Sequence, residues 1–259
     1  MAEKGLLTLS IDCGGGGIKA SVVDHAGNLV AQPIRTPTPY PLPPSLLVET
    51  FLTLASQLPE AQRVTVGMPG MIRDGKVVAT PHYVTKDGPR SKVLPELVTA
   101  WRSFDMEEAV QQALGKMALV LNDAEVAGAG TVLGRGLEMI ITLGTGLGNA
   151  VFHNGRLAPH TEISQGYVRW GMTYDDYIGE HERLRLGDVH WSRRARRVVE
   201  TLRPMYLWDR LYIGGGNASR ITATQRLKLG GEVKYISNEA GILGGVRAWE
   251  LLRPDQECQ

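Results

Sequence analysis

The sequence predicts an α/β fold built from two similar halves. Two stretches predict it, residues 7–19 and 139–151, because each is an apolar strand that breaks at clustered glycines and then resumes as a strand. Each copy next reaches a polar turn, at residues 25–28 and 153–156. Since strand, glycine loop, strand and turn occur twice in the same order, we expect a duplicated fold.

Both glycine loops are predicted to bind phosphate. Asp12 ends the first apolar run, and four glycines, residues 14–17, follow it closely. Glycine has no Cβ, so the backbone can approach a ligand and direct N–H groups at it, while Asp12 is placed to hold a metal ion or its waters. Both loops are hairpins and fit neither the Walker nor the dinucleotide pattern. A turn without a ligand is a strong alternative for either copy alone, but two copies favour phosphate.

Length, charge and cysteine content exclude several classes of protein. The chain has 259 residues, enough for one large domain or two ordinary ones, and its net charge of +1 argues against a nucleic-acid binder or a membrane-surface protein. Cys13 and Cys258 are the only cysteines, so no disulfide framework is expected. No apolar run approaches the roughly 18 residues of a membrane helix. We therefore expect a soluble, cytoplasmic protein.

The first half reads as alternating strands and helices. A proline-rich segment at residues 33–44, either a rigid recognition arm or, as we favour, a connector, precedes a helix at 45–57, for which Ser45 is a plausible cap. A strand at 63–66 ends at the turn Gly67–Gly70, which is either punctuation or the rim of a substrate cleft. The further predicted elements are a hairpin arm at 75–80, a polar loop at 81–90 and short helices at 94–101 and 106–114.

Asn122 and Asp123 stand between a continuous apolar strand, residues 117–121, and a helix at 124–133. Open α/β sheets place ligand groups at such a point. Asp123 could equally be the N-cap of the helix, since Asp is among the preferred capping residues. From spacing alone, a capping role and a catalytic role for Asp123 are equally well supported.

The second half continues with a polar turn at 159–166 and a charged helix at 174–185. The next helix has an apolar stripe from Trp191 to Leu202, and its other side carries Arg193, Arg194, Arg196, Arg197 and Arg203. A solvated face is the default for these arginines, and a track for a polyanion is the alternative. A strand at 207–213 leads to a third glycine loop at 214–217, and a helix rich in small residues covers 238–248.

These motifs resemble the ROK family of sugar kinases, and within it the enzymes that phosphorylate glucose with polyphosphate. Six motifs occur in the order of the family: Asp12 to Lys19, Gly67 to Gly70, Asn122 to Ala124, Leu143 to Gly148, Thr161 with Glu162, and Ile213 to Gly216. The resemblance implies the actin-like, ribonuclease-H-like two-domain kinase fold, with duplicated βββαβα-type halves and a central cleft. We expect the domains to be residues 1–121 and 122–259, with the last helix, about 238–252, packing back on the N-terminal half.

The resemblance also implies roles for particular residues. Asp123 is expected to be the base for the attacking hydroxyl, and Asp12 is expected to hold the hydration shell of Mg²⁺. The residues expected to bind donor phosphates are Gly14, Gly15, Gly16, Gly17, Lys19, Gly144, Thr145, Gly146 and Gly148. Those expected to bind the sugar are Asn122, Glu162, Gly67, Pro69, Gly70, His82 and Gln165, and those beside a nucleotide are Gly214, Gly215 and Gly216.

Two sugar-side positions depart from the family pattern. Where relatives read E-L-G-H, with a histidine that faces the sugar and in many members binds zinc, this chain ends the motif in Gln165. Where relatives read A-P-N, it has His82 in place of the asparagine. The cysteine cluster of the zinc-binding members is also missing, so we expect no structural zinc. Phosphoryl transfer is therefore better supported than glucose as the acceptor.

We expect a sugar kinase that transfers a phosphoryl group from polyphosphate or ATP to a hexose hydroxyl, with the glucose 6-OH favoured. The alternatives are an ATP-dependent kinase of the same family for another sugar and a catalytically weak, sugar-binding regulatory protein. The changes at His82 and Gln165 favour the regulator, whereas the retained Asp12 and Asp123 argue against it. We expect Mg²⁺ as cofactor, a homodimer, and neither nucleic acid nor membrane as partner.

Overall fold

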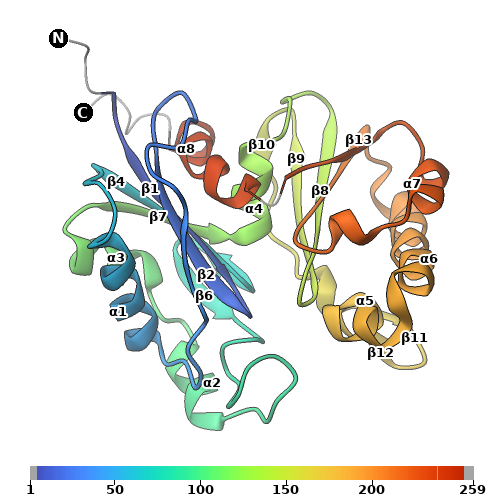
Figure 1. Cartoon of the computed structure of the whole chain (residues 1–259), viewed down its shortest axis with the longest axis horizontal. Helices are drawn as coiled ribbons and strands as arrows, with labels where there is room; N and C mark the ends of the chain where they lie inside the picture. Colours follow the sequence, from blue (N-terminus) through green and yellow to red (C-terminus); the bar gives the residue numbers. More distant parts are fainter. Residues whose placement is uncertain (1–4, 238, 254–259) are drawn as a thin grey trace. The chain divides into compact units, whose positions relative to one another are not determined.

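The structure, a computed structural model, describes residues 5–237 and 239–253. The chain divides into two compact units (Figure 1). The first unit consists of Met1–Gly130 and Gly241–Gln259, and the second is the continuous segment Thr131–Ala240. The chain therefore leaves the first unit once and returns to it for its last helix.

The first unit is built on a five-stranded sheet in the order β3-β2-β1-β4-β7. Its strands are β1 (Thr8–Gly14), β2 (Gly17–Val23), β3 (Ile34–Thr36), β4 (Arg63–Met68) and β7 (Met117–Asn122). β1 pairs antiparallel with β2, and β2 with β3, whereas β1, β4 and β7 run parallel. A small separate hairpin joins β5 (Met71–Arg73) to β6 (Lys76–Ala79).

Helices cover both faces of this sheet (Figure 1). One side carries α1 (Pro44–Ala55) and α3 (Met106–Leu114), with α2 (Pro95–Trp101) near one end, and the other carries α4 (Asp123–Ala129) and α8 (Ala240–Leu252). Trp249 of α8 is buried, and its indole N–H donates to the Thr65 hydroxyl of β4 at 2.8 Å. Gly245 lies so close to the sheet that an added Cβ would be 2.3 Å from Ser10 Oγ. The small residues of this helix therefore allow a tight contact with the sheet.

The second unit is built on a sheet in the order β10-β9-β8-β13-β14. Its strands are β8 (Leu137–Leu143), β9 (Leu147–His153), β10 (Arg156–Leu157), β13 (Arg210–Gly214) and β14 (Val233–Tyr235). The outer pairs β10·β9 and β9·β8 are antiparallel, and β8·β13 and β13·β14 are parallel. Strand order and directions repeat those of the first sheet, so the predicted duplication is confirmed.

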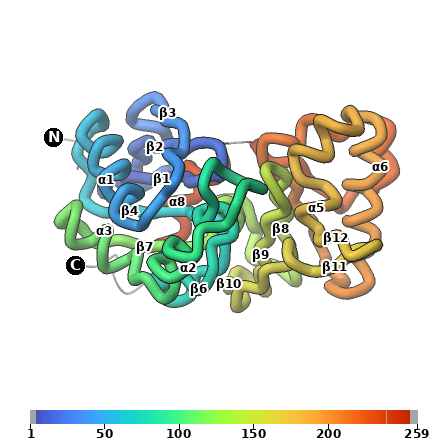
Figure 2. The backbone as a smooth tube through the Cα atoms, turned by 90° about the horizontal axis from the view of Figure 1, so that it is seen from below, coloured from blue at the N-terminus to red at the C-terminus, as the bar shows by residue number. Residues whose placement is uncertain are grey.

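Helices α5 (Tyr174–Ile178), α6 (Glu180–Tyr206) and α7 (Ala223–Leu229) pack beside the second sheet. In Figure 2, α5 lies between α6 and the β8–β9 hairpin. The predicted apolar stripe of α6 is confirmed, because Trp191, Ala195, Val198, Val199 and Leu202 are all buried. A short hairpin, β11 (Tyr167–Arg169) and β12 (Met172–Thr173), precedes α5.

Several predicted elements need correction. Ser45 does not cap α1, because the helix begins at Pro44 after Pro43 without a side-chain cap. The helix predicted at 174–185 is interrupted at Gly179, and α6 runs from Glu180 through a break at Gly187. β3, β14 and α7 were not predicted. Asn238 of the predicted last helix lies outside the described residues. Within the described ranges, no helix has the length and apolar character needed to span a bilayer.

Candidate functional site

The first glycine loop is a tight hairpin. Gly14 pairs with Gly17, so Gly15 and Gly16 alone form the turn. Asp12 lies within β1, two residues before its end, and not at the end of the strand as predicted. The proline-rich segment holds the turn, because the Thr38 hydroxyl donates to the Gly14 carbonyl at 2.7 Å and the Tyr40 hydroxyl to the Gly15 carbonyl at 2.9 Å. These bonds fix the carbonyls of the turn.

Asp12 is the acidic group of this hairpin. Its Oδ2 lies 3.7 Å from Lys19 Nζ, directly across the β1–β2 ladder. Burial raises the pKa of Asp12, and the Lys19 ammonium and the Arg35 guanidinium oppose that rise. A Cβ on Gly241 would be 2.9 Å from the Asp12 carboxyl carbon, so the first turn of α8 packs against this group.

Arg35 is a cation that sequence analysis missed. It pairs with Lys19 across the β2–β3 ladder, and a Cβ on Gly17 would meet its Nε at 2.8 Å. Two cationic side chains thus flank the glycine turn on neighbouring strands. The proline-rich pattern around Arg35 predicts an extended segment and gives no sign of a cation beside the glycine turn.

The parallel strands of the first unit bring Asp12 and Asp123 to the same end of the sheet, where the strands have their carboxyl ends. Asp12 on β1 pairs with Gly67 on β4, and Gly67 pairs with Leu121 on β7, directly before Asn122 and Asp123. Buried Cys13 lies close enough to Asp12 and Asp123 that, after burial itself, both carboxylates raise the pKa of its thiol. Asp12, predicted to hold the metal, and Asp123, predicted to be the base, therefore lie at the same end of one sheet.

Asn122, and not Asp123, is the N-cap of α4. Its Oδ1 accepts the N–H of Ala124 at 2.9 Å, and Glu125 Oε2 accepts the N–H of Asn122 at 3.0 Å, which completes a capping box. Asn122 Nδ2 also donates to the Gly70 carbonyl at 2.8 Å. Asp123 is the first helical residue and is half-buried, with Oδ1 accepting the Ala124 N–H at 2.9 Å.

The turn Gly67–Gly70 is fitted to the start of α4. A Cβ on Gly67 would be 3.2 Å from Asp123 Cα and from a Val126 methyl group. Gly70 has φ of 102°, and a Cβ there would be 2.2 Å from the Ala79 carbonyl oxygen. Pro69 between them is buried, and His82 is half-buried just beyond β6. Glycine is therefore required at Gly70, whereas a side chain at Gly67 would press on the start of α4.

Residues at the junction of α5 and α6 form hydrogen bonds with the second glycine loop. The Glu180 N–H donates to the Gly144 carbonyl at 3.0 Å, and Leu147 N–H donates to Asp175 Oδ1 at 2.7 Å. Among the described residues, no protein acceptor receives the N–H of Thr145 or Gly146. The two N–H groups at the tip are therefore available to an anion.

The third glycine loop packs on the second. Gly215 has φ of 83°, and a Cβ there would be 2.4 Å from the Leu143 carbonyl oxygen. Gly214 ends β13, and Gly216 has open space at its Cβ position. The next residue, Asn217, donates its N–H to the Leu143 carbonyl at 2.9 Å and its side-chain amide to the Gly144 carbonyl at 3.2 Å. The structure thus brings two predicted donor loops together in the second unit.

Glu162 precedes a single 3-10 turn, Ile163–Gln165, and Gln165 is the last residue of that turn. Glu162 Oε2 lies 3.7 Å from Nε2 of buried His160. Gln165 Nε2 donates to Ser164 Oγ at 2.9 Å and to Asp175 Oδ2 at 3.3 Å. Asp175, which no motif indicated, therefore links this turn to the second glycine loop.

The described residues contain no group of three or more His, Cys, Asp or Glu side chains able to hold a metal ion. Asp12 is the carboxylate of the first hairpin, opposite Lys19 on the β1–β2 ladder. The first unit offers a glycine turn with cations beside it and a carboxylate at the end of β7, and the second unit offers a glycine loop with N–H groups at its tip.

The chain is similar in sequence to known proteins over most of its length. Polyphosphate glucokinase of Mycobacterium tuberculosis is 29% identical over 252 residues, covering 92% of this chain and 89% of that protein. Polyphosphate glucokinase of Mycobacterium leprae is 26% identical over 254 residues, covering 92% of this chain and 73% of that protein.

Solved structures match over nearly the whole chain. The polyphosphate/ATP-glucomannokinase of Arthrobacter sp. strain KM has a TM-score of 0.77 at 26% identity, over 93% of this chain and 97% of that one. A ROK glucokinase from Streptomyces griseus, solved with glucose and AMPPNP, has a TM-score of 0.69 at 19% identity, over 93% of this chain and 98% of that one. These matches confirm the predicted actin-like fold class.

The ROK family model matches residues 8–161, which include β1, the Gly67–Gly70 turn, Asp123 and the second glycine loop. That range is more than half of the chain, and it contains both copies of the glycine hairpin. The chain belongs to the ROK family.

Proposed function

We propose that this protein transfers a phosphoryl group from polyphosphate or ATP to a hexose hydroxyl, with the glucose 6-OH as the favoured acceptor. The curated relatives and the solved Arthrobacter structure are named for polyphosphate-dependent glucose or mannose kinases, which supports this donor and this class of sugar. Phosphoryl transfer asks a protein mainly to position groups and balance charge. The two units provide such groups.

The observation that carries the proposal is the division of labour between Asn122 and Asp123. Capping α4 would occupy the Asp123 carboxylate, but Asn122 and Glu125 already form the capping box. The cap of α4 therefore does not depend on the Asp123 carboxylate, which lies at the carboxyl end of β7 where α/β sheets bind ligands. This carboxylate would accept the proton of the attacking sugar hydroxyl. The proposed sugar contacts Gly67, Pro69, Gly70 and His82 belong to the same unit.

Donor phosphates would be held by backbone N–H groups and by cations. In the first unit these are the N–H groups of the Gly15–Gly16 turn, with Lys19 and Arg35 beside them. In the second unit they are the N–H groups of Thr145 and Gly146. Such concave N–H turns favour anions. Gly214 to Gly216 would border a nucleotide when ATP is the donor.

Asp12 fits a magnesium site of the kind that phosphoryl transfer needs. Mg²⁺ usually keeps several waters and takes only one or two carboxylates, with substrate phosphates as further ligands. One aspartate beside a phosphate-binding turn is sufficient for that. When bound, the ion would neutralise charge on the transferring phosphoryl group.

The test is a matrix of donors and sugars with the wild type and Asp123→Asn. The wild type should phosphorylate at least one hexose with polyphosphate or ATP. The variant should lose at least about a hundredfold in kcat, the scale of general base catalysis, while sugar binding and the unfolding transition stay near wild type. A variant with wild-type turnover would show that Asp123 is not the base, and a wild type inactive with every donor and sugar would overturn the proposed function.

A further inference from the structure

Asp175 lies on α5 against the second glycine loop, and the proposed chemistry does not use it. Its Oδ1 accepts the N–H of Leu147 at 2.7 Å. A Cβ on Gly146 would lie 2.1 Å from the same oxygen, so only glycine allows the carboxyl group to come this close. The second glycine loop and the Asp175 carboxyl group are therefore in close contact, which a side chain at Gly146 would prevent.

The second glycine loop is hydrogen-bonded at both of its ends, Gly144 and Leu147, whereas its tip, Thr145 and Gly146, has N–H groups that could bind an anion. At one end Gly144 receives the Glu180 N–H at 3.0 Å, and at the other Asp175 receives the Leu147 N–H. Gly179, between α5 and α6, approaches the loop as well, since a Cβ there would be 2.5 Å from the Thr145 carbonyl oxygen. Asp175 contributes its side-chain carboxylate directly to a backbone N–H of this loop. Its position determines where the tip presents its N–H groups.

The other oxygen of Asp175 connects the loop to the sugar-side turn. Oδ2 lies 3.3 Å from Gln165 Nε2, which also donates to the buried Ser164 hydroxyl at 2.9 Å. The same turn is fixed to β9, because Ile163 N–H donates to Asn149 Oδ1 at 3.2 Å. One carboxyl group therefore contacts both the loop proposed for the donor and the turn proposed for the acceptor.

We propose that Asp175 is a positioning residue that fixes the second glycine loop for donor phosphates and joins it to the sugar-side turn. This inference rests on the proposed function. It assigns Asp175 no contact with the reacting atoms: the residue acts through Leu147 N–H and through Gln165.

The surroundings of Asp175 make its charge sensitive to pH. Burial, and then the neighbouring carboxylates Glu162 and Asp176, raise the pKa of Asp175 to about 6, although the Leu147 N–H lowers it. His160 faces Glu162, and Glu180 at the start of α6 is paired with Arg183. An ionised Asp175 would repel a polyanionic donor bound at the loop tip. Donor binding should therefore weaken as the pH rises through about 6.

The experiment compares the wild type, Asp175→Ala and Asp175→Asn in donor KM, sugar KM and kcat on both sides of about pH 6. Asp175→Ala loses the acceptor of the Leu147 N–H, so its donor KM should rise roughly tenfold, the effect of one charged hydrogen bond. Asp175→Asn keeps an acceptor oxygen without the charge, so it should rescue donor KM and lose the pH-dependent step. Titration of the donor itself is common to all three proteins and cancels in the comparison.

Asp176→Asn is the matched control, because it removes the neighbouring carboxylate, which caps α5 through the Thr173 N–H at 3.1 Å. It should lower the melting temperature and keep the pH step, moved to lower pH. Binding of tripolyphosphate, measured by calorimetry at both pH values, needs no catalysis and separates the outcomes. Tripolyphosphate binding with the step, but no sugar phosphorylation, would overturn only the proposed function. Donor KM and binding in Asp175→Ala equal to the wild type, with stability alone reduced, would overturn the inference.

Discussion

At the residue scale, two adjacent polar residues at the end of β7 have different tasks. Asn122 joins the cap of α4 to the Gly70 carbonyl, so Asn122→Ala should lower the free energy of unfolding by about 2 kcal/mol. Asp123→Ala removes the bond to the adjacent Ala124 N–H but leaves the capping box of Asn122 and Glu125 in place, so it should cost less than half of that. Urea denaturation of both variants measures the difference. Equal losses would mean that Asp123 shares the cap.

Asp12 gives a second prediction, about metal. Asp12→Asn keeps the shape of the side chain but offers a neutral oxygen, so saturation with Mg²⁺ should need at least about ten times more of the ion. Lys19→Met serves as the control for the lost ion pair, which spans 3.7 Å in the wild type. Titration of activity with Mg²⁺ gives the measurement. Removal of zinc should leave activity unchanged, and a zinc requirement would contradict this assignment.

Glu138 gives a pH prediction in the second unit. Burial raises the pKa of this fully buried carboxyl group, but the N–H groups of Leu133, Gly134 and Arg135 and the Tyr212 hydroxyl outweigh burial and hold the pKa below 4.5. A lowered pKa adds stability above the unfolded value of 4.5, and that stability is lost as the pH falls through the folded value.

Glu138→Gln should therefore unfold more easily than the wild type at pH 7, by about 2 kcal/mol, because an amide hydrogen would face backbone donors. The difference should shrink as the pH falls below 4.5. Denaturation curves of both proteins at several pH values test this. A difference that does not change with pH would assign the loss to packing.

Some of these residues could be predicted and others could not. Asp12, Asp123 and the glycine turns follow short patterns at strand ends, and the parallel strands of the first unit then bring Asp12 and Asp123 to the same end of the sheet. Arg35 and Asp175 lie in no such pattern, and Asn217 ends the third glycine loop without any sign of its contacts. The partners are far away in the sequence: Asp175 meets Leu147, and Asn217 meets Gly144. The assigned roles of the candidate residues stay predictions.

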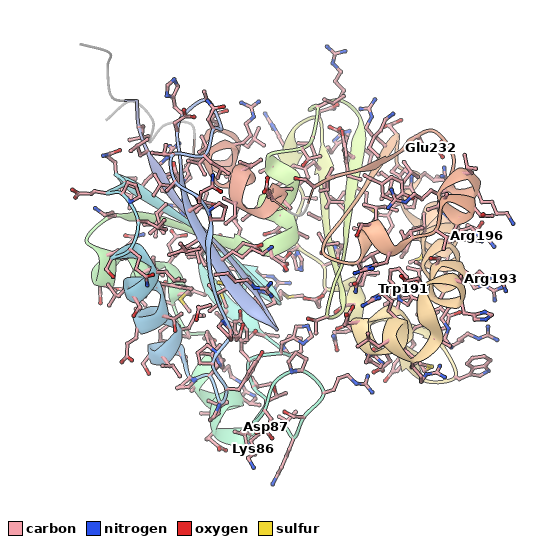
Figure 3. The ribbon with its side chains drawn as sticks, in the orientation of Figure 1. Lys86, Asp87, Trp191, Arg193, Arg196 and Glu232 are labelled. Carbon is pink, nitrogen blue, oxygen red and sulfur yellow. The ribbon has the colours of Figure 1, made fainter. Side chains whose placement is uncertain are left out.

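At the element scale, α6 separates structural arginines from free ones. Arg194 donates to Glu182 and lies over the Tyr177 ring, and Arg196 donates to Gln225. In the described chain, the exposed guanidinium groups of Arg193 and Arg197 have no ion pair. Figure 3 shows Arg193 pointing outward from α6, whereas Trp191 points inward. Helical periodicity predicted the buried stripe, but it could not tell which arginines have acidic partners on other segments.

These free arginines test whether polyphosphate lies along α6. Arg193→Gln with Arg197→Gln should raise the apparent KM for polyphosphate roughly threefold to tenfold, since each exposed contact is weak. The effect should shrink with rising salt, and ATP-driven turnover should hardly change. Arg196→Gln is the control, because its partner Gln225 is on α7 and its loss should affect stability. If the KM values for both donors changed equally, or if neither changed, Arg193 and Arg197 would only form a solvated face of the helix.

At the scale of the whole molecule, the second unit is one continuous segment and the first is not. Residues 131–240 expressed alone should therefore fold, with their own sheet and core. Residues 5–130 alone lack α8 and its buried Ile242, Val246 and Trp249. At about 2 kcal/mol for each buried side chain, that loss is comparable to the whole stability of a domain. The fragment of residues 5–130 should therefore unfold or aggregate.

Circular dichroism and urea denaturation of both fragments measure this difference. A third fragment, in which a flexible linker joins residues 5–130 to 241–253, should recover cooperative unfolding. A stable first fragment without α8 would contradict the prediction. The duplicated order of strands made the fold class predictable from the sequence, whereas the return of the last helix to the first sheet was expected only from the family resemblance. The homodimer stays a prediction.

The return of α8 also sets an order for synthesis on the ribosome. The helix is the last described element to emerge, so the inserted second unit can finish folding while the first sheet still has one face uncovered. Thr65 and Ser10 would meanwhile face water until Trp249 and Gly245 arrive. A nascent chain stalled before residue 240 would thus present an incomplete first unit to chaperones and proteases, beside a finished second one.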